Sequence, residues 1–163
     1  MPNKLGTHGF EFAIDVPATS SELQRSWTQG SEMDWLAAGT EGIYSQPVTA
    51  EARPGGQWRV LMVETPEKQY YTGGVYESVE PSTVSFRWGA PDGWPVLDPD
   101  NLSSAPLITV SWVKDGDVSR MTLALSVDPD APEDTREQVV CDPCRQGWMA
   151  TVSRLQDKFS QSG

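Results

Sequence analysis

Two closely spaced cysteines, Cys141 and Cys144, are the residues of this chain that come nearest to a known chemistry. They flank Asp142 and Pro143, which suit the N-cap and the first position of a helix. Two thiols with this spacing at a helix N-terminus are typical of dithiol oxidoreductases, because the N–H groups at the helix end lower the pKa of a thiol. Those enzymes carry the pair after a parallel strand near the N-terminus, and this sequence contains no β-α-β pattern. Buried inert thiols are therefore the favoured interpretation, while a regulatory disulfide and a redox or metal site remain open.

Other catalytic arrangements lack the residues that they require. The chain has one histidine, His8, so a Ser–His or Cys–His pair is unsupported. One histidine with two cysteines also falls short of the four ligands of a structural zinc site. The glycine motifs that bind phosphates or dinucleotides are absent from the sequence. We predict no catalytic residue, no metal site and no cofactor, and we favour a protein that is not an enzyme. Catalysis by a cavity-facing Glu77 with a tyrosine stays open.

Tryptophan is unusually frequent, with seven residues among 163. Each is large and carries one N–H that needs a partner when it is buried. Seven in a small protein indicate either an aromatic core or the wall of an internal cavity. The residues that we expect to line a cavity are Trp58, Tyr71, Tyr76, Trp88, Trp112 and Trp148, with Arg59 and Glu77 as polar anchors. For each tryptophan alone, core packing remains the alternative.

Residues 91–106 form a long segment without apolar periodicity, rich in proline and aspartate. A segment of this length in a small domain is either a functional lid or a disordered excursion. It carries Trp94 and Leu97, which we expect to form a gate over the cavity. Attachment of Trp94 to the edge of the sheet is the alternative.

Alternating apolar residues indicate strands over most of the chain. Residues 10–16 alternate in this way, and Pro17 ends the pattern. The same period of two returns between residues 42 and 128, where hairpin signals at 65–68 and at Asp115-Gly116 separate consecutive strands. We expect these further strands at 42–50, 57–64, 70–80, 84–88, 108–112 and 121–127, with a bulge or a close backbone approach at Gly73-Gly74.

Two patterns indicate helices. Thr19 and Glu22 have the spacing of a capping box, so a short helix should follow them, and a second very short helix should carry Trp35. Near the C-terminus the apolar residues change to the three- and four-residue spacing of an amphipathic helix. They are Cys144, Trp148, Val152, Leu155 and Phe159. This order of elements predicts an α+β fold, in which the C-terminal helix covers the apolar face of an antiparallel sheet.

Three segments of the strand region carry a resemblance to known proteins. They are Gly55-Gly56-Gln57-Trp58-Arg59, Gly74-Val75-Tyr76-Glu77-Ser78-Val79-Glu80-Pro81 and Val84-Ser85-Phe86-Arg87-Trp88. With the order of elements, they resemble the START-like (SRPBCC) superfamily, and within it the bacterial domains akin to the activator of the heat-shock chaperone ATPase. The resemblance covers about residues 8–160 and implies a single domain over residues 1–163 with a helix-grip fold. In that fold a curved antiparallel sheet of about six to seven strands wraps around a long C-terminal helix, and two short helices follow the first strand.

The resemblance also implies a function. START-like domains bind small hydrophobic or amphipathic ligands in a cavity between the sheet and the C-terminal helix, and the resemblance carries no defined catalytic activity. Two alternatives follow from the same resemblance. One is a protein-interaction module of the co-chaperone kind, and the other is a cyclase- or hydratase-type enzyme that uses the same cavity.

Charge and composition narrow the partners. The formal net charge of −11 repels phosphate backbones and anionic lipid surfaces, which argues against nucleic acid and membrane binding. The sequence has no apolar run of the length that crosses a bilayer, about 18 residues or more. The first nine residues lack the apolar segment of a secretory signal, and two cysteines make no disulfide framework. We therefore expect a cytoplasmic protein whose partner is a small molecule or, in the alternative, a protein.

Overall fold

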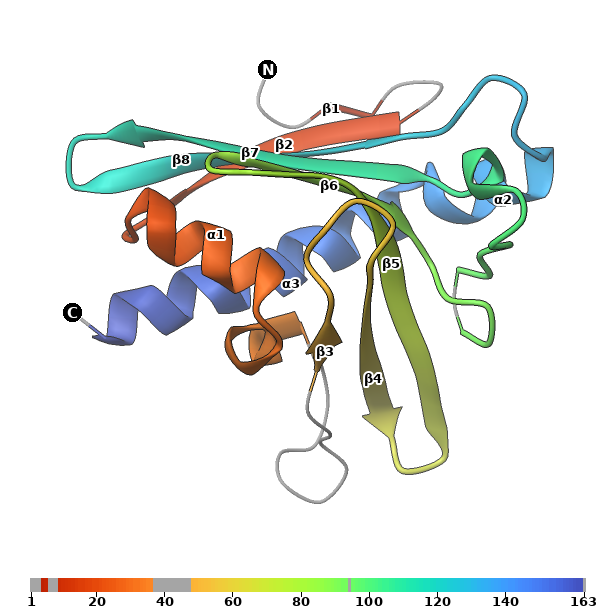
Figure 1. The fold of residues 1–163 in the computed structure, drawn as a ribbon, viewed down its shortest axis with the longest axis horizontal. Helices are drawn as coiled ribbons and strands as arrows, with labels where there is room; N and C mark the ends of the chain where they lie inside the picture. Colours follow the sequence, from red (N-terminus) through yellow and green to blue (C-terminus); the bar gives the residue numbers. More distant parts are fainter. Residues whose placement is uncertain (1–3, 6–8, 37–47, 94, 163) are drawn as a thin grey trace.

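The computed structural model describes residues 4–5, 9–36, 48–93 and 95–162 (Figure 1). Within them a single sheet holds eight strands in the order β1-β2-β8-β7-β6-β5-β4-β3, and every neighbouring pair is antiparallel. The strands are β1 (Lys4–Leu5), β2 (Gly9–Val16), β3 (Thr49–Ala50), β4 (Gln57–Thr65), β5 (Lys68–Glu80), β6 (Thr83–Trp88), β7 (Leu107–Asp115) and β8 (Val118–Ser126). The long strands match the periodic segments of the sequence. Of the strand expected at 42–50, residues 42–47 lie outside the described residues.

The period of two explains the two faces of the sheet. On β7 and β8 the buried side chains alternate with exposed or half-buried ones, and the register pairs Trp112 with Met121 and Val110 with Leu123. The hairpin between these strands closes at Gly116, whose φ of 65° lies in the left-handed region that favours glycine. The sequence signal at Asp115-Gly116 is therefore confirmed as a tight turn.

The first helix begins where the sequence indicates. Helix α1 (Ser20–Thr28) has the expected capping box: the Glu22 backbone N–H donates to Thr19 Oγ1 at 3.1 Å, and the Thr19 N–H donates to Glu22 Oε1 at 2.8 Å. The second short helix is replaced by two 3-10 turns, η1 (Gly30–Glu32) and η2 (Asp34–Leu36). The remaining helical elements are the 3-10 turn η3 (Leu102–Ser104), α2 (Glu133–Val139) and α3 (Asp142–Ser162).

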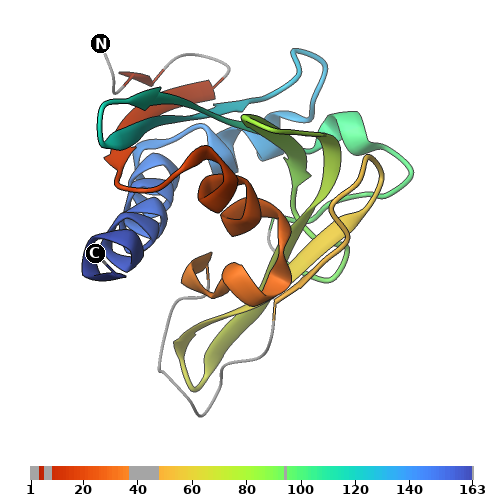
Figure 2. The same ribbon diagram turned by 60° about the vertical axis from the view of Figure 1, so that its left-hand side comes forward.

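Helix α3 supplies the cover that the sheet needs. Helices α1 and α3 lie on the same side of the sheet, and α3 contacts β2 and η2. Figure 2 shows that β4 and β5 run steeply away from β7 and β8, so the sheet curves around the two helices. The helix-grip, START-like fold expected from the resemblance is confirmed. In the described part of the chain, no helix has the length and apolarity needed to span a bilayer.

Aromatic rings form the centre of the core. The ring of Phe86 lies 5.2 Å from that of Trp58, 6.2 Å from that of Trp27 and 6.3 Å from that of Tyr76, measured between centroids. Trp27 in turn meets Trp35 edge to face at 4.8 Å. Edge-to-face contacts of this kind stabilise a core beyond the area that they bury. Phe86, on β6, thus joins α1 to β4 and β5.

The segment 91–106 packs on the outer face of the sheet. Leu97 is 2% exposed and forms a small cluster with Val75 and Ala105, away from the main core. Asp92 accepts a two-pronged hydrogen bond from Arg59, with one N–O distance of 2.6 Å. Leu97 therefore lines only a small hollow on this outer face, with Arg59 and Val75, and not the space between the sheet and α3 where the gate was expected. Trp94, the other expected gate residue, lies outside the described residues.

Candidate functional site

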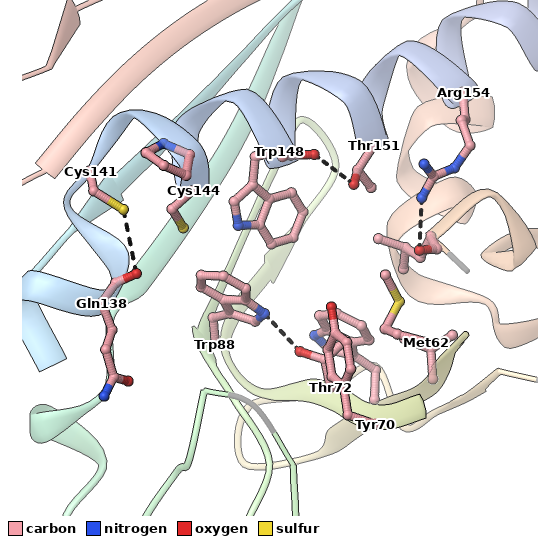
Figure 3. A pocket seen from close by; sticks show the side chains of 15 residues that line it. Met62, Tyr70, Thr72, Trp88, Gln138, Cys141, Cys144, Trp148, Thr151 and Arg154 are labelled. Carbon is pink, nitrogen blue, oxygen red and sulfur yellow. Dashed lines mark hydrogen bonds between the residues drawn. The ribbon is translucent and has the colours of Figure 1, made fainter. Parts of the chain in front are cut away.

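A pocket of about 420 Å³ lies between α3 and the strands β4, β5 and β6 (Figure 3). Its walls are mostly apolar and aromatic. The lining residues are Leu36, Trp58, Val60, Met62, Tyr70, Thr72, Trp88, Gln138, Cys141, Pro143, Cys144, Gly147, Trp148, Thr151 and Arg154. Pro143 and Gly147 are exposed, so the pocket opens to solvent beside the first turns of α3.

Strand alternation builds the sheet side of this pocket. On β4 every second residue faces it, namely Trp58, Val60 and Met62, and on β5 Tyr70 and Thr72 do the same. The pairing of Trp58 with Gly74 explains the glycine: a Cβ there would lie 2.7 Å from both Trp58 Nε1 and Phe86 Cδ2. Gly73-Gly74 is thus a close backbone approach, and the bulge lies further along β5.

Two tryptophans from different elements meet across the pocket. Trp88, at the end of β6, donates its indole N–H to Thr72 Oγ1 at 2.9 Å, which fixes the orientation of its ring. The Trp148 ring from α3 stands edge to face against it, with centroids 5.2 Å apart and an interplanar angle of 70°. The contact joins α3 to β6, and both rings form part of the pocket wall.

Three of the eight residues expected to line a cavity line this pocket: Trp58, Trp88 and Trp148. Tyr76 and Trp112 face the same side of the sheet but are buried in the core. The Tyr76 hydroxyl donates to the Trp27 carbonyl at 2.7 Å, and burial raises its pKa above the ordinary value of a tyrosine. The Trp112 indole N–H donates to Ser20 Oγ at 2.9 Å. Both satisfy their polar atoms within the fold.

The other three, Arg59, Tyr71 and Glu77, lie on the outer face. Arg59 lies over the Tyr71 ring at 3.8 Å, in addition to its bond with Asp92. Asp92 raises the pKa of Arg59, and Arg59 lowers the pKa of Asp92. Arg87 Nε donates to Glu77 Oε2 at 2.6 Å. Strand parity decides this placement, because each of these residues neighbours an inward-facing one along its strand.

Comparison with protein families assigns this chain to one of them. The model of the family "Activator of Hsp90 ATPase homolog 1-like protein" matches residues 18–160, nearly the whole of the described chain. The chain belongs to this family. No curated protein matches it.

Several solved structures have the same fold as this chain, although their sequence identity to it is low. A Mycobacterium smegmatis protein shares 16% identity with a TM-score of 0.73, and the match covers 100% of this chain and 99% of that one. An Arthrobacter aurescens protein also shares 16%, with a TM-score of 0.74 over 98% and 91% of the two chains. DynU16, a protein of the dynemicin biosynthetic locus, shares 17% with a TM-score of 0.60, over 93% of this chain and 47% of that one.

Several residues that line the pocket of this protein were not predicted from its sequence. Tyr70 and Thr72 come from the strand around Gly73-Gly74, where the sequence left it ambiguous which residues face inward. Met62 shares the strand face of Trp58 by alternation, but neither it nor Leu36 was among the expected cavity residues. Thr151 follows Gly147 by four residues and Arg154 follows Thr151 by three, so the three residues share one face of α3. The sequence does not indicate that this face lines a pocket. Arg154 is the pocket's guanidinium, and it replaces Arg59 as the candidate polar anchor.

The two cysteines, Cys141 and Cys144, line the pocket as free thiols. Burial, with a smaller contribution from Cys141, raises the pKa of Cys144 to about 12. The Cys141 thiol donates a hydrogen bond to the Gln138 carbonyl at 3.6 Å. A redox-active dithiol needs a lowered pKa. The structure therefore favours an inert thiol at Cys144 over the oxidoreductase interpretation.

We expect Cys144 to resist alkylation while this protein is folded. At pH 8 a thiol with a pKa near 12 is almost wholly protonated, whereas an unfolded cysteine has a pKa of about 8.5. Unfolding in urea should therefore accelerate its reaction with iodoacetamide by more than about a hundredfold, measured by mass spectrometry of the Cys144 peptide. Equal rates in the folded and unfolded protein would contradict the raised pKa.

Proposed function

We propose that this protein binds a small apolar or amphipathic molecule in the pocket between α3 and the strands β4 to β6, without a defined catalytic activity. The observation that carries the proposal is an open pocket of about 420 Å³ with three tryptophans in its wall. Natural small-molecule sites have volumes of about 300–1,000 Å³ and mostly apolar walls with a few polar groups. We further propose that it works in the cytoplasm, where its free cysteines would stay reduced.

The packing supports binding rather than catalysis. Glu77, the acid considered for catalysis, lies on the outer face and pairs with Arg87. Among the described residues that line the pocket, none is an aspartate or a glutamate. Acid–base chemistry of the hydratase kind would need such a group within hydrogen-bonding reach of the ligand. The co-chaperone-like alternative rests on family membership alone.

Gly147 offers a direct test, because it lines the pocket and a Cβ at this position would meet no atom within 4 Å. Gly147→Phe should place a ring in the mouth of the pocket without a clash. We expect it to weaken binding of the neutral fluorescent probe N-phenylnaphthylamine by at least about tenfold, measured by fluorescence titration. Phenylalanine is also a better helix former than glycine, so the variant should fold.

The matched variant is Gly147→Ala. It removes the same glycine but adds only one methyl group, so probe binding should stay unchanged while the free energy of unfolding rises by about 0.5–1 kcal/mol. The function is rejected if the wild-type protein shows no saturable binding. Equal affinity of Gly147→Phe and Gly147→Ala would place the probe elsewhere on the molecule.

A further inference from the structure

Arg154 is a cation in a mostly apolar pocket. Its Nε donates to the Trp35 carbonyl at 2.8 Å, and its Nη2 donates to the Leu36 carbonyl at 3.1 Å. Burial lowers the pKa of this arginine, which is the direction that loss of water produces for a cation. A guanidinium stays charged at neutral pH in spite of such a shift. The pocket therefore contains one fixed positive charge (Figure 3).

That charge has no acidic partner among the residues that the structure describes. Six other arginines form ion pairs with a carboxylate: Arg25, Arg53, Arg59, Arg87, Arg120 and Arg145. This happens readily in a chain with 23 acidic residues. Arg154 instead bonds to two main-chain carbonyls, which use two of its five N–H groups. Its remaining donors and its charge are available to a group in the pocket.

We propose that the pocket selects amphipathic anions, with the acidic head on Arg154 and the apolar body along Trp88 and Trp148. The inference rests on the proposed function and specifies its ligand class. Helix α3 rises about 1.5 Å per residue, so Cys144 and Arg154 are separated by about 15 Å along its axis. Figure 3 shows Arg154 at one end of the pocket and the cysteines at the other, with the two tryptophans between them. The charge thus lies at one end of an elongated apolar site, which matches a molecule with a single acidic end.

A purely structural role for Arg154 is the competing explanation. The two carbonyls belong to η2, and a positive charge at the C-terminal end of a helical turn stabilises it. Substitution alone could then impair binding by loosening η2. The test must therefore compare two ligands that differ only in charge, because a loosened pocket weakens both and a lost charge weakens one.

Anilinonaphthalene sulfonate and N-phenylnaphthylamine form such a pair, since they share one aromatic skeleton and only the first carries a sulfonate. In Arg154→Met, which keeps an apolar stem, we expect the affinity for the sulfonate to fall at least about tenfold. The affinity for the neutral probe should change by less than about twofold. Arg154→Lys, which keeps the charge but not the planar fork, should retain a preference for the sulfonate. Circular dichroism checks that both variants fold.

The outcomes separate the two proposals. If the wild-type protein binds neither probe, the proposed function fails. If it binds both, and Arg154→Met weakens both equally or neither, Arg154 is structural and the anion selectivity is overturned. A measurement on the wild-type protein needs no variant: dodecanoate should displace the neutral probe at a concentration at least about tenfold lower than dodecanol. Equal displacement by acid and alcohol would also overturn the inference.

Discussion

Phe86→Ala should lower the free energy of unfolding by about 3–5 kcal/mol, the cost of removing a buried aromatic side chain. Phe86 is 1% exposed and its ring contacts those of Trp27, Trp58 and Tyr76. The substitution leaves a cavity at the junction of α1 with the central strands and removes three aromatic contacts at once. Urea denaturation followed by circular dichroism measures the loss.

The matched control is Val113→Ala on β7, whose side chain is 71% exposed. Away from packing contacts a substitution changes stability by about 0.5 kcal/mol or less. A loss of less than about 1.5 kcal/mol for Phe86→Ala would show that neighbouring side chains refill the space. Such a result would mean that the aromatic centre is more adaptable than its ring contacts indicate.

Trp88→Ala and Trp112→Ala should have equal effects on stability and different effects on binding. Each side chain is buried and hydrogen-bonded through its indole nitrogen, so each substitution should cost about 3–5 kcal/mol. Only Trp88 lines the pocket. We expect Trp88→Ala to weaken binding of N-phenylnaphthylamine by about tenfold or more, because a wall of the site is lost, and Trp112→Ala to leave it unchanged.

The pair must be titrated at a temperature at which circular dichroism shows both variants folded. Because the two substitutions destabilise the protein alike, a difference in probe affinity reports the pocket and not partial unfolding. Equal loss of binding in both would indicate that the probe senses the general integrity of the core. Unchanged binding in both would move the site away from Trp88.

The sequence was most informative about where helices, strands and turns lie. It was least informative about which side of the sheet each side chain faces. The capping box at Thr19 and the Asp115-Gly116 turn depend on interactions within a few residues, so both were predictable. On β5 the chain has apolar or small residues on both faces near Gly73-Gly74. The alternation is weak there, so it did not decide the facing of Tyr71 and Glu77, which were expected in the cavity and lie on the outer face.

The site was partly predictable for the same reason. Trp88 and Trp148 belong to strongly periodic segments, and both line the pocket. Arg154 was overlooked because a charged residue on an amphipathic helix is usually solvated. Its role depends on η2, which approaches it from more than a hundred residues away in sequence. Only the folded chain shows which charged residue of α3 lies against a second element.

Most of the side-chain hydrogen bonds between the helices and the sheet have a main-chain carbonyl as their acceptor. The Tyr76 hydroxyl on β5 donates to the Trp27 carbonyl of α1, and the Gln156 side-chain amide on α3 donates to the Asp15 carbonyl of β2. A carbonyl is present whatever residue occupies the accepting position. Substitutions at the acceptor positions therefore preserve these bonds, while substitutions at the donors remove them. A fold fastened in this way can accumulate many sequence changes during evolution and still hold its helices at the same distance from the sheet.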